Sequence, residues 1–300
     1  MKNFVSGVVA VALACGVWSA GAQDWAKANL AKSPRHGEYV TIKEANGRAL
    51  QAWVVYPEVK GKASVVVMIH EIFGLSDWAR EMADELAGAG YIVVEPDLLS
   101  GFAPPTGTAA APAGAPMGHD HMQSGGGAGA AFVPATPGGT AAFPDQGAAV
   151  KAVSSLDAGV VTADLDAAAD YGKNLPASNG KLFVAGFCWG GGQSFLFATH
   201  RKDLSGAMVF YGPPPSTEAM KNISAPVYGF YAGNDARISA TIPDTTAAMK
   251  AAGKTYTPVT YDGAGHGFMR AGEAPNASAE NAAARAAGFR RLVELLGGVR

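Results

Sequence analysis

The 300-residue chain has only two cysteines, Cys15 and Cys188, so a disulfide-rich scaffold is excluded. Charged residues are also scarce, at 16% of the chain, and the formal net charge is −2. Without a basic excess or long runs of charge, nothing in the sequence favours binding to nucleic acid or to an anionic membrane. After residue 22, no apolar run approaches the about 18 residues that indicate a membrane span.

Residues 1–22 have the pattern of a secretory signal peptide. Lys2 supplies a positive charge, Phe4 to Val17 form an apolar core, and Ala20-Gly21-Ala22 is a small-residue cleavage site. Removal of this segment leaves residues 23–300, a length that suits one large α/β domain. The sequence therefore predicts an exported protein, periplasmic or secreted.

Export would leave only one of the two cysteines in the mature protein. Cleavage after Ala22 removes Cys15 and leaves Cys188 as a single thiol in an oxidising compartment. Cys188 is then either buried and inert or functional. Lipoprotein processing at Cys15 is an alternative, although Ala12 stands where leucine is usual.

Eight apolar runs predict β-strands, and several are continuous rather than alternating, which suits strands buried on both faces. Helical periodicity around Met82, Leu165, Met249 and Leu292 falls between these runs. A mostly parallel sheet covered by helices on both faces is therefore expected. The predicted strands are Tyr39–Ile42, Ala52–Tyr56, Val65–Ile69, Ile92–Glu95, Leu182–Ala185, Ala207–Tyr211, Val227–Tyr231 and Tyr256–Tyr261.

Residues 103–147 interrupt this alternation. They are rich in alanine, glycine, proline and threonine without a sustained period, which predicts a disordered or loosely ordered insertion. The insertion contains His119-Asp120-His121-Met122, whose imidazole and thioether groups are copper ligands. Because the segment offers no rigid scaffold and no second cluster, we predict no metal site and interpret it as a polar part of a loop.

Gly186-Phe187-Cys188-Trp189-Gly190 lies between a predicted strand and a helix-compatible stretch. Strand, Gly-x-Cys-x-Gly and helix form the pattern of a nucleophile elbow with cysteine in place of serine. Small residues on both sides permit the sharp turn, which directs the N–H of Trp189 toward a developing oxyanion. Since 39 of the 300 residues are glycine, a buried structural cysteine is the alternative for this motif alone.

Acid and histidine candidates follow the elbow in the order that such hydrolases use. Asp235 comes just after one predicted strand, and His266 lies in a glycine-rich loop after the next. Asp244 fits the intervening helix better, and Asp262 fits the histidine loop. His266 could accept the thiol proton while Asp235 fixes its tautomer. The thiol pKa of about 8.5 must be lowered or bypassed.

His70-Glu71-Ile72-Phe73-Gly74 follows the predicted strand Val65–Ile69. The loop at this place supplies the second oxyanion donor in such folds. Glu71 could act as a second base there. A carboxylate at the start of a helix is the alternative for Glu71.

These features together resemble the dienelactone hydrolase (carboxymethylenebutenolidase) family of the α/β-hydrolase superfamily. The resemblance runs from Gly37 to the C-terminus, apart from the insertion, and includes the spacing of Cys188, Asp235 and His266. The matching segments are Glu71 to Gly74, Pro96-Asp97-Leu98, Asp164 to Ala168, Ser178 to Lys181, and Gly265 to Phe268 with Arg270.

The resemblance implies an α/β-hydrolase fold and a triad of Cys188, Asp235 and His266. Glu71 would hold the thiol in the resting enzyme and deprotonate it when substrate arrives.

It also implies an oxyanion hole made by the N–H groups of Ile72 and Trp189, and a role for Arg270 in binding a substrate carboxylate. No cofactor is implied. Well-studied members carry a second arginine shortly after Pro-Asp-Leu, whereas Leu98-Leu99-Ser100-Gly101-Phe102 contains none.

We therefore expect a monomeric hydrolase that cleaves a small ester or lactone through a cysteinyl acyl-enzyme. An exported general esterase or thioesterase is the first alternative, since the second arginine is missing and the insertion could cover the pocket. A non-catalytic binding protein on the same fold and a copper-handling protein that uses residues 119–122 are the others.

Overall fold

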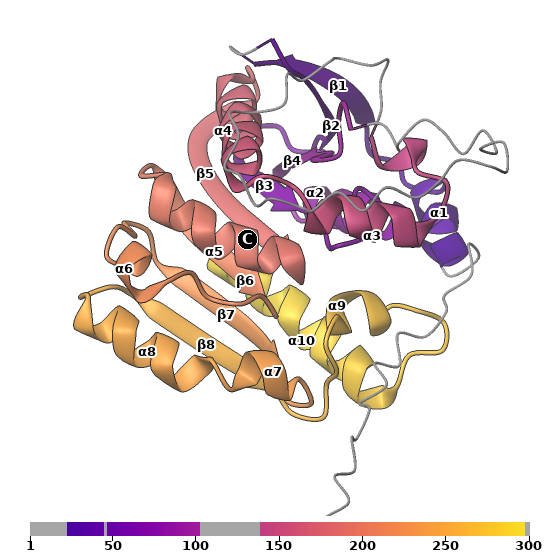
Figure 1. Ribbon diagram of the computed structural model, residues 1–300. Coiled ribbons are helices and arrows are strands. Elements are labelled where there is room, and N and C mark those ends of the chain that lie inside the picture. The colour runs from indigo at the N-terminus through magenta and orange to yellow at the C-terminus, as the bar shows by residue number, and fades with distance from the viewer. Residues whose placement is uncertain (1–22, 45–46, 103–138, 298–300) are drawn as a thin grey trace, which may run out of the picture.

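The computed structural model of the protein describes residues 23–44, 47–102 and 139–297 (Figure 1). In these residues eight strands form one sheet in the order β1-β2-β4-β3-β5-β6-β7-β8. The pairs β1–β2 and β2–β4 are antiparallel, and the other neighbouring pairs are parallel. The strands are β1 (Gly37–Lys43), β2 (Ala49–Val55), β3 (Ala63–Ile69), β4 (Ile92–Pro96), β5 (Ser178–Phe187), β6 (Leu204–Phe210), β7 (Val227–Ala232) and β8 (Tyr256–Tyr261).

All eight predicted strands are present, and the mostly parallel sheet is confirmed. Successive side chains of β3 enter opposite cores: Val65 and Val67 lie in one, whereas Val66 and Met68 lie in the other. Because both faces are covered, every residue from Val65 to Ile69 is apolar and buried. Full burial of one such valine or methionine contributes about 1.5–3 kcal/mol to folding.

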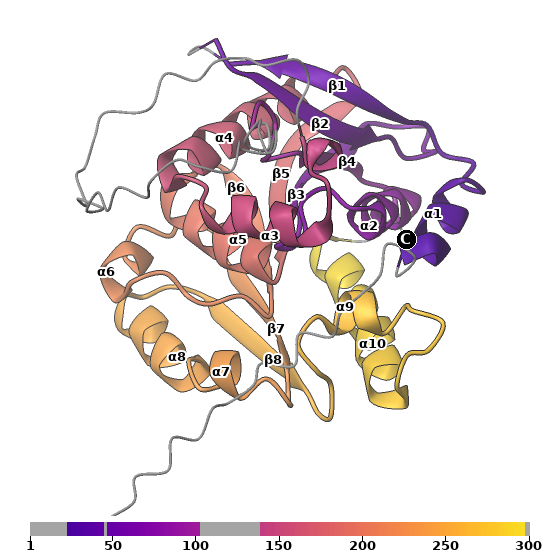
Figure 2. The ribbon, with the colours of Figure 1, turned by 45° about the vertical axis from the view of Figure 1, so that its right-hand side comes forward.

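Helices cover both faces of the sheet (Figure 2). Side chains from α4, α5 and α8 fill one core, and side chains from α1, α2 and α10 fill the other. The positions that predicted these helices, Met82, Leu165, Met249 and Leu292, are all buried. The helices are α1 (Asp24–Leu30), α2 (Asp77–Gly88), α3 (Gln146–Ser154), α4 (Ala158–Asn174), α5 (Trp189–His200), α6 (Thr217–Met220), α7 (Ala236–Ser239), α8 (Ile242–Ala251), α9 (Phe268–Ala271) and α10 (Ala279–Leu295), with a short 3₁₀ turn η2 (Thr140–Ala142).

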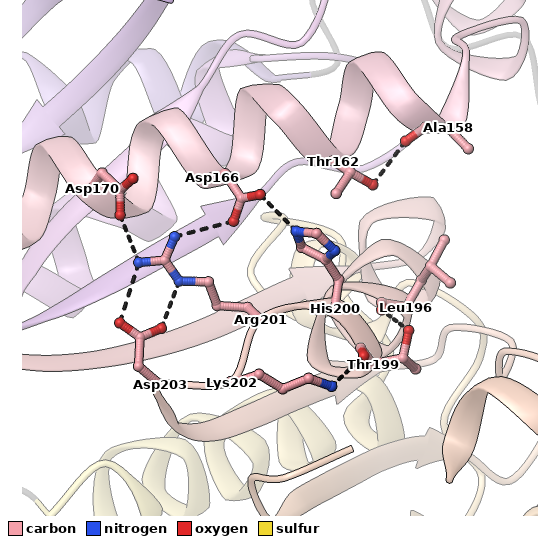
Figure 3. A network of polar contacts seen from close by, with 10 residues as sticks. All are labelled: Ala158, Thr162, Asp166, Asp170, Leu196, Thr199, His200, Arg201, Lys202 and Asp203. Carbon is pink, nitrogen blue, oxygen red and sulfur yellow. Dashed lines mark hydrogen bonds and ion pairs between the residues drawn. The ribbon is translucent and has the colours of Figure 1, made fainter. Parts of the chain in front are cut away.

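A polar network joins α4 to the end of α5 (Figure 3). The Arg201 guanidinium donates to Asp166 at 3.1 Å and to Asp170 at 2.6 Å. Its Nε also donates to Asp203 at 2.6 Å, and His200 Nε2 lies 2.7 Å from Asp166. His200 therefore belongs to a contact between helices and not to the elbow.

Residues 139–147, the end of the expected insertion, differ from the expectation of loose order. The backbone N–H and the hydroxyl of Thr140 donate to the Asp97 carboxylate at 2.7 and 2.9 Å. The same hydroxyl accepts the N–H of Leu75 at 2.8 Å, and Asp145 caps α3. Polar contacts order this stretch, and such contacts leave no periodic apolar signal in the sequence.

Two of the sequence predictions concern residues that the structure does not describe. The signal peptide of residues 1–22 and the His119–Met122 segment lie outside the described residues. Among the helices of the described part, none has the length and apolar character needed to cross a bilayer.

Candidate active site

Cys188 stands at the turn between β5 and α5, where its backbone has φ 56° and ψ −116°. The flanking glycines make this turn possible. A Cβ on Gly186 would lie 2.0 Å from the carbonyl oxygen of Gly190, and a Cβ on Gly190 would lie 2.4 Å from that of Ile69. The close approach, together with the strained φ of a non-glycine residue, gives the geometry of a nucleophile elbow.

The structure brings Cys188, His266 and Asp235 together. His266 Nε2 lies 3.1 Å from the Cys188 sulfur, and His266 Nδ1 lies 2.5 Å from Asp235 Oδ2. Since the carboxylate accepts the Nδ1 proton, Nε2 is left to accept the proton of the thiol. Asp235 also caps α7, which holds the carboxylate at the end of β7.

Glu71 and Arg270 form an ion pair beside this triad. Arg270 Nε donates to Glu71 Oε2 at 2.6 Å, and the guanidinium lies 4.9 Å from the ring centre of Phe73. The Glu71 side chain is 3% exposed and that of Arg270 is 16% exposed. Glu71 was expected to hold the resting thiol, whereas here the thiol lies against His266 and Glu71 pairs with Arg270.

Burial raises the pKa of the Cys188 thiol to about 12, and the nearby charge of Glu71 acts in the same direction. The backbone N–H groups of Trp189 and Ile72 face the sulfur and lower this pKa, as does Arg270. The thiol is therefore protonated at neutral pH, and it would have to lose this proton to act as a nucleophile. The same two N–H groups stand where the sequence placed an oxyanion hole.

Two residues without an assigned role line this site. Tyr211 directly follows β6, is fully buried with φ 40°, and its ring meets that of His266 at 5.1 Å. Its backbone conformation was invisible in the sequence, where it appeared to end an apolar strand. His70 is fully buried and contacts both the Glu71 backbone and the Trp189 ring.

Other candidates for metal or acid chemistry lie apart from the triad. No cluster of three or more histidine, cysteine or acidic side chains within residues 23–44, 47–102 and 139–297 is arranged to hold a metal ion. Asp244 lies in the first turn of α8, as expected.

A model of the dienelactone hydrolase family matches residues 50–299. The chain belongs to this family. It is 28% identical over 235 residues to the carboxymethylenebutenolidase of Pseudomonas putida, covering 78% of this chain and 86% of that protein. Membership confirms the predicted enzyme class, a carboxylic ester hydrolase of the carboxymethylenebutenolidase type.

Solved structures confirm the α/β-hydrolase fold of this family member. The dienelactone hydrolase of Anabaena variabilis has a TM-score of 0.57 at 18% identity, over 89% of this chain and 99% of that one. A dienelactone hydrolase-like promiscuous phosphotriesterase, P91 from metagenomic libraries, has a TM-score of 0.62 at 19% identity, over 88% and 98%.

Proposed function

We propose that this dienelactone hydrolase family member cleaves a small ester or lactone through a cysteinyl acyl-enzyme. The observation that carries the proposal is the line from Cys188 through His266 to Asp235, with distances of 3.1 and 2.5 Å. A nucleophile, a base and an orienting acid at hydrogen-bond distance form the arrangement that acyl transfer requires.

Acylation begins when the Cys188 sulfur attacks the substrate carbonyl carbon and His266 Nε2 takes the thiol proton. The carbonyl oxygen becomes an oxyanion and accepts hydrogen bonds from the N–H groups of Ile72 and Trp189. When the tetrahedral intermediate collapses, the bond to the leaving oxygen breaks and His266 returns the proton to it. Asp235 stabilises the imidazolium between these steps.

Deacylation repeats the cycle with water. His266 removes a proton from the water as its oxygen attacks the thioester carbon, and the C–S bond then breaks. The carboxylic acid leaves, and the sulfur recovers its proton from His266.

The Glu71–Arg270 pair gives the site its response to substrate charge. A substrate carboxylate that binds Arg270 competes with Glu71 for the guanidinium, because both are anions. For such a substrate Glu71 is then free to take the thiol proton in place of His266 and to return it to the leaving oxygen. Arg270 thus serves as the carboxylate-binding residue and Glu71 as a second base.

A general esterase or thioesterase is the second candidate, favoured by two observations. Residues 98–102 contain no arginine, and Arg270 is held by Glu71. Neutral substrates would leave this pair intact. In either case we propose that the protein acts as a monomer after export and removal of residues 1–22.

The test is hydrolysis by purified residues 23–300 of a panel of chromogenic esters, thioesters and unsaturated lactones. Cys188→Ala and His266→Ala should each lower kcat by about three or more decades, since triad members act as a unit. His200→Ala is the matched control, because it removes a histidine of the α4–α5 network, and should retain full activity. Full activity of protein whose Cys188 is completely alkylated would contradict the proposal.

A further inference from the structure

His70 lies between β3 and the loop that carries Glu71, and its side chain is fully buried. Its Nδ1 is 2.7 Å from the backbone carbonyl oxygen of Glu71. A carbonyl oxygen can only accept a hydrogen bond, so Nδ1 carries the proton and donates it. This donor is present whether the imidazole is neutral or charged.

The hydrogen bond acts on one particular peptide group. The Glu71 carbonyl and the Ile72 N–H belong to the same planar unit and point in opposite directions. The Ile72 N–H faces the sulfur of Cys188. Fixing the carbonyl end therefore fixes the direction of the N–H, and polarisation of the carbonyl makes that N–H a stronger donor.

The face of the His70 ring contacts the elbow that carries Cys188. The imidazole is stacked on the indole of Trp189, with centroids 5.8 Å apart and an interplanar angle of 16°. Trp189 supplies the second N–H beside the sulfur. One buried side chain thus touches both segments whose N–H groups meet at Cys188.

The surroundings of the second ring nitrogen, Nε2, indicate that the hydrogen bond of Nδ1 is the reason for a histidine at this position. Among the described residues, His70 Nε2 has no hydrogen-bond partner although it is buried. An unpartnered buried polar atom is unfavourable, and an apolar side chain of similar size would avoid it. A histidine here is explained by what its Nδ1 does.

We propose that His70 is a positioning residue of the oxyanion hole, which holds the Ile72 N–H toward the developing oxyanion through its hydrogen bond to the Glu71 carbonyl. The inference rests on the proposed function, because it assumes acyl transfer at Cys188. It adds a residue that acts through the backbone of the loop and not on the substrate.

The test compares H70F, which keeps an aromatic ring beside Trp189 but has no donor, with H70N. The Asn amide nitrogen is the same number of bonds from Cα as Nδ1, so it can donate to the same carbonyl. For the ester that wild-type residues 23–300 hydrolyse best, H70F should lower kcat about 10- to 100-fold with KM nearly unchanged, because loss of a whole oxyanion donor costs about 10²–10³. H70N should recover most of kcat.

Alkylation of Cys188 by iodoacetamide is the internal control. This reaction occurs at a saturated carbon and forms no oxyanion, so H70F should lose much less of its alkylation rate than of kcat. Some loss is expected, because the Ile72 N–H also faces the sulfur and lowers the pKa of the thiol. Equal losses of alkylation and hydrolysis, or wild-type kcat in H70F, would overturn the inference, as would an H70N no better than H70F. If H70F does not fold, H70L replaces it, because leucine also has no hydrogen-bond donor. A wild type that hydrolyses nothing contradicts the proposed function and does not bear on His70.

Discussion

At the scale of single residues, the surroundings of Cys188 determine whether its thiol is protonated. Burial is the main cause of its raised pKa, followed by the charge of Glu71, and the Trp189 and Ile72 N–H groups and Arg270 offset only part of this. Cys188 at rest is therefore a thiol, and in the proposed mechanism each attack is linked to proton transfer to His266.

This protonation state predicts the pH dependence of alkylation. With the pKa raised to about 12, the thiolate fraction grows about tenfold for each pH unit below it. The rate of iodoacetamide labelling of residues 23–300 should therefore rise steadily from pH 7 to 10 without a plateau. A mass-spectrometric time course at each pH measures it. A labelling rate that stays constant from pH 7 to 10 would show instead that the thiolate is already formed as an ion pair with His266.

Glu71 and Arg270 show what sequence could and could not predict at this scale. The position of its loop after β3 pointed to Glu71, whereas Arg270 was indicated by the family resemblance alone. Their pairing across 199 positions of sequence could not be inferred, since neither a carboxylate nor a guanidinium indicates its partner. The same limit applies to the hydrogen bond of His70 with a backbone carbonyl.

At the scale of elements, the central strands were predictable because burial on both faces gives them continuous apolar runs, such as Val65–Ile69 in β3. The order of nucleophile, acid and histidine followed from the strands that precede them. The helix α1 was missed, because among its seven residues only Ala26 is buried and no apolar stripe results.

The contact between Thr140 and Asp97 was not predicted for another reason. It consists of hydrogen bonds between residues that lie 43 positions apart in the sequence. These bonds tie η2 to the end of β4. The bond from the Leu75 N–H to the Thr140 hydroxyl ties η2 to the loop that follows Glu71 as well. One hydroxyl therefore joins three segments of the chain.

Thr140→Val should destabilise the protein by about 1–3 kcal/mol, because it removes the hydroxyl that donates to Asp97 and leaves the Leu75 N–H without its acceptor. Urea unfolding measures the loss, and Thr140→Ser should restore most of it. Thr245→Val is the control, since this buried hydroxyl bonds only within its own helix region, to Thr241 O at 2.7 Å. Equal losses in Thr140→Val and Thr245→Val would mean that the Thr140 contacts contribute no more to stability than an ordinary buried threonine hydroxyl.

At the scale of the whole molecule, stability depends on carboxyl groups buried during folding. Burial raises the pKa of Glu81 to about 8, with the charges of Glu273 and Glu85 acting in the same direction. Burial also raises the pKa of Glu95 well above its ordinary value, and Arg80 opposes this only in part. Both groups bind protons more tightly in the folded protein than in the unfolded chain, whose glutamates ionise near pH 4.3.

The free energy of unfolding should therefore fall as pH rises above about 4.5 toward the raised folded-state values, since the folded state holds more protons in that window. Glu95→Gln keeps the side-chain shape and removes the titrating group. Relative to wild type it should become more stable with rising pH, by at most about 1.4 kcal/mol per pH unit. Urea unfolding at pH 5.5, 7 and 8.5 measures this difference. Glu218→Gln, at a side chain that is 81% exposed, should leave the pH dependence unchanged, and a Glu95→Gln curve parallel to wild type would show that Glu95 is ionised in the folded protein.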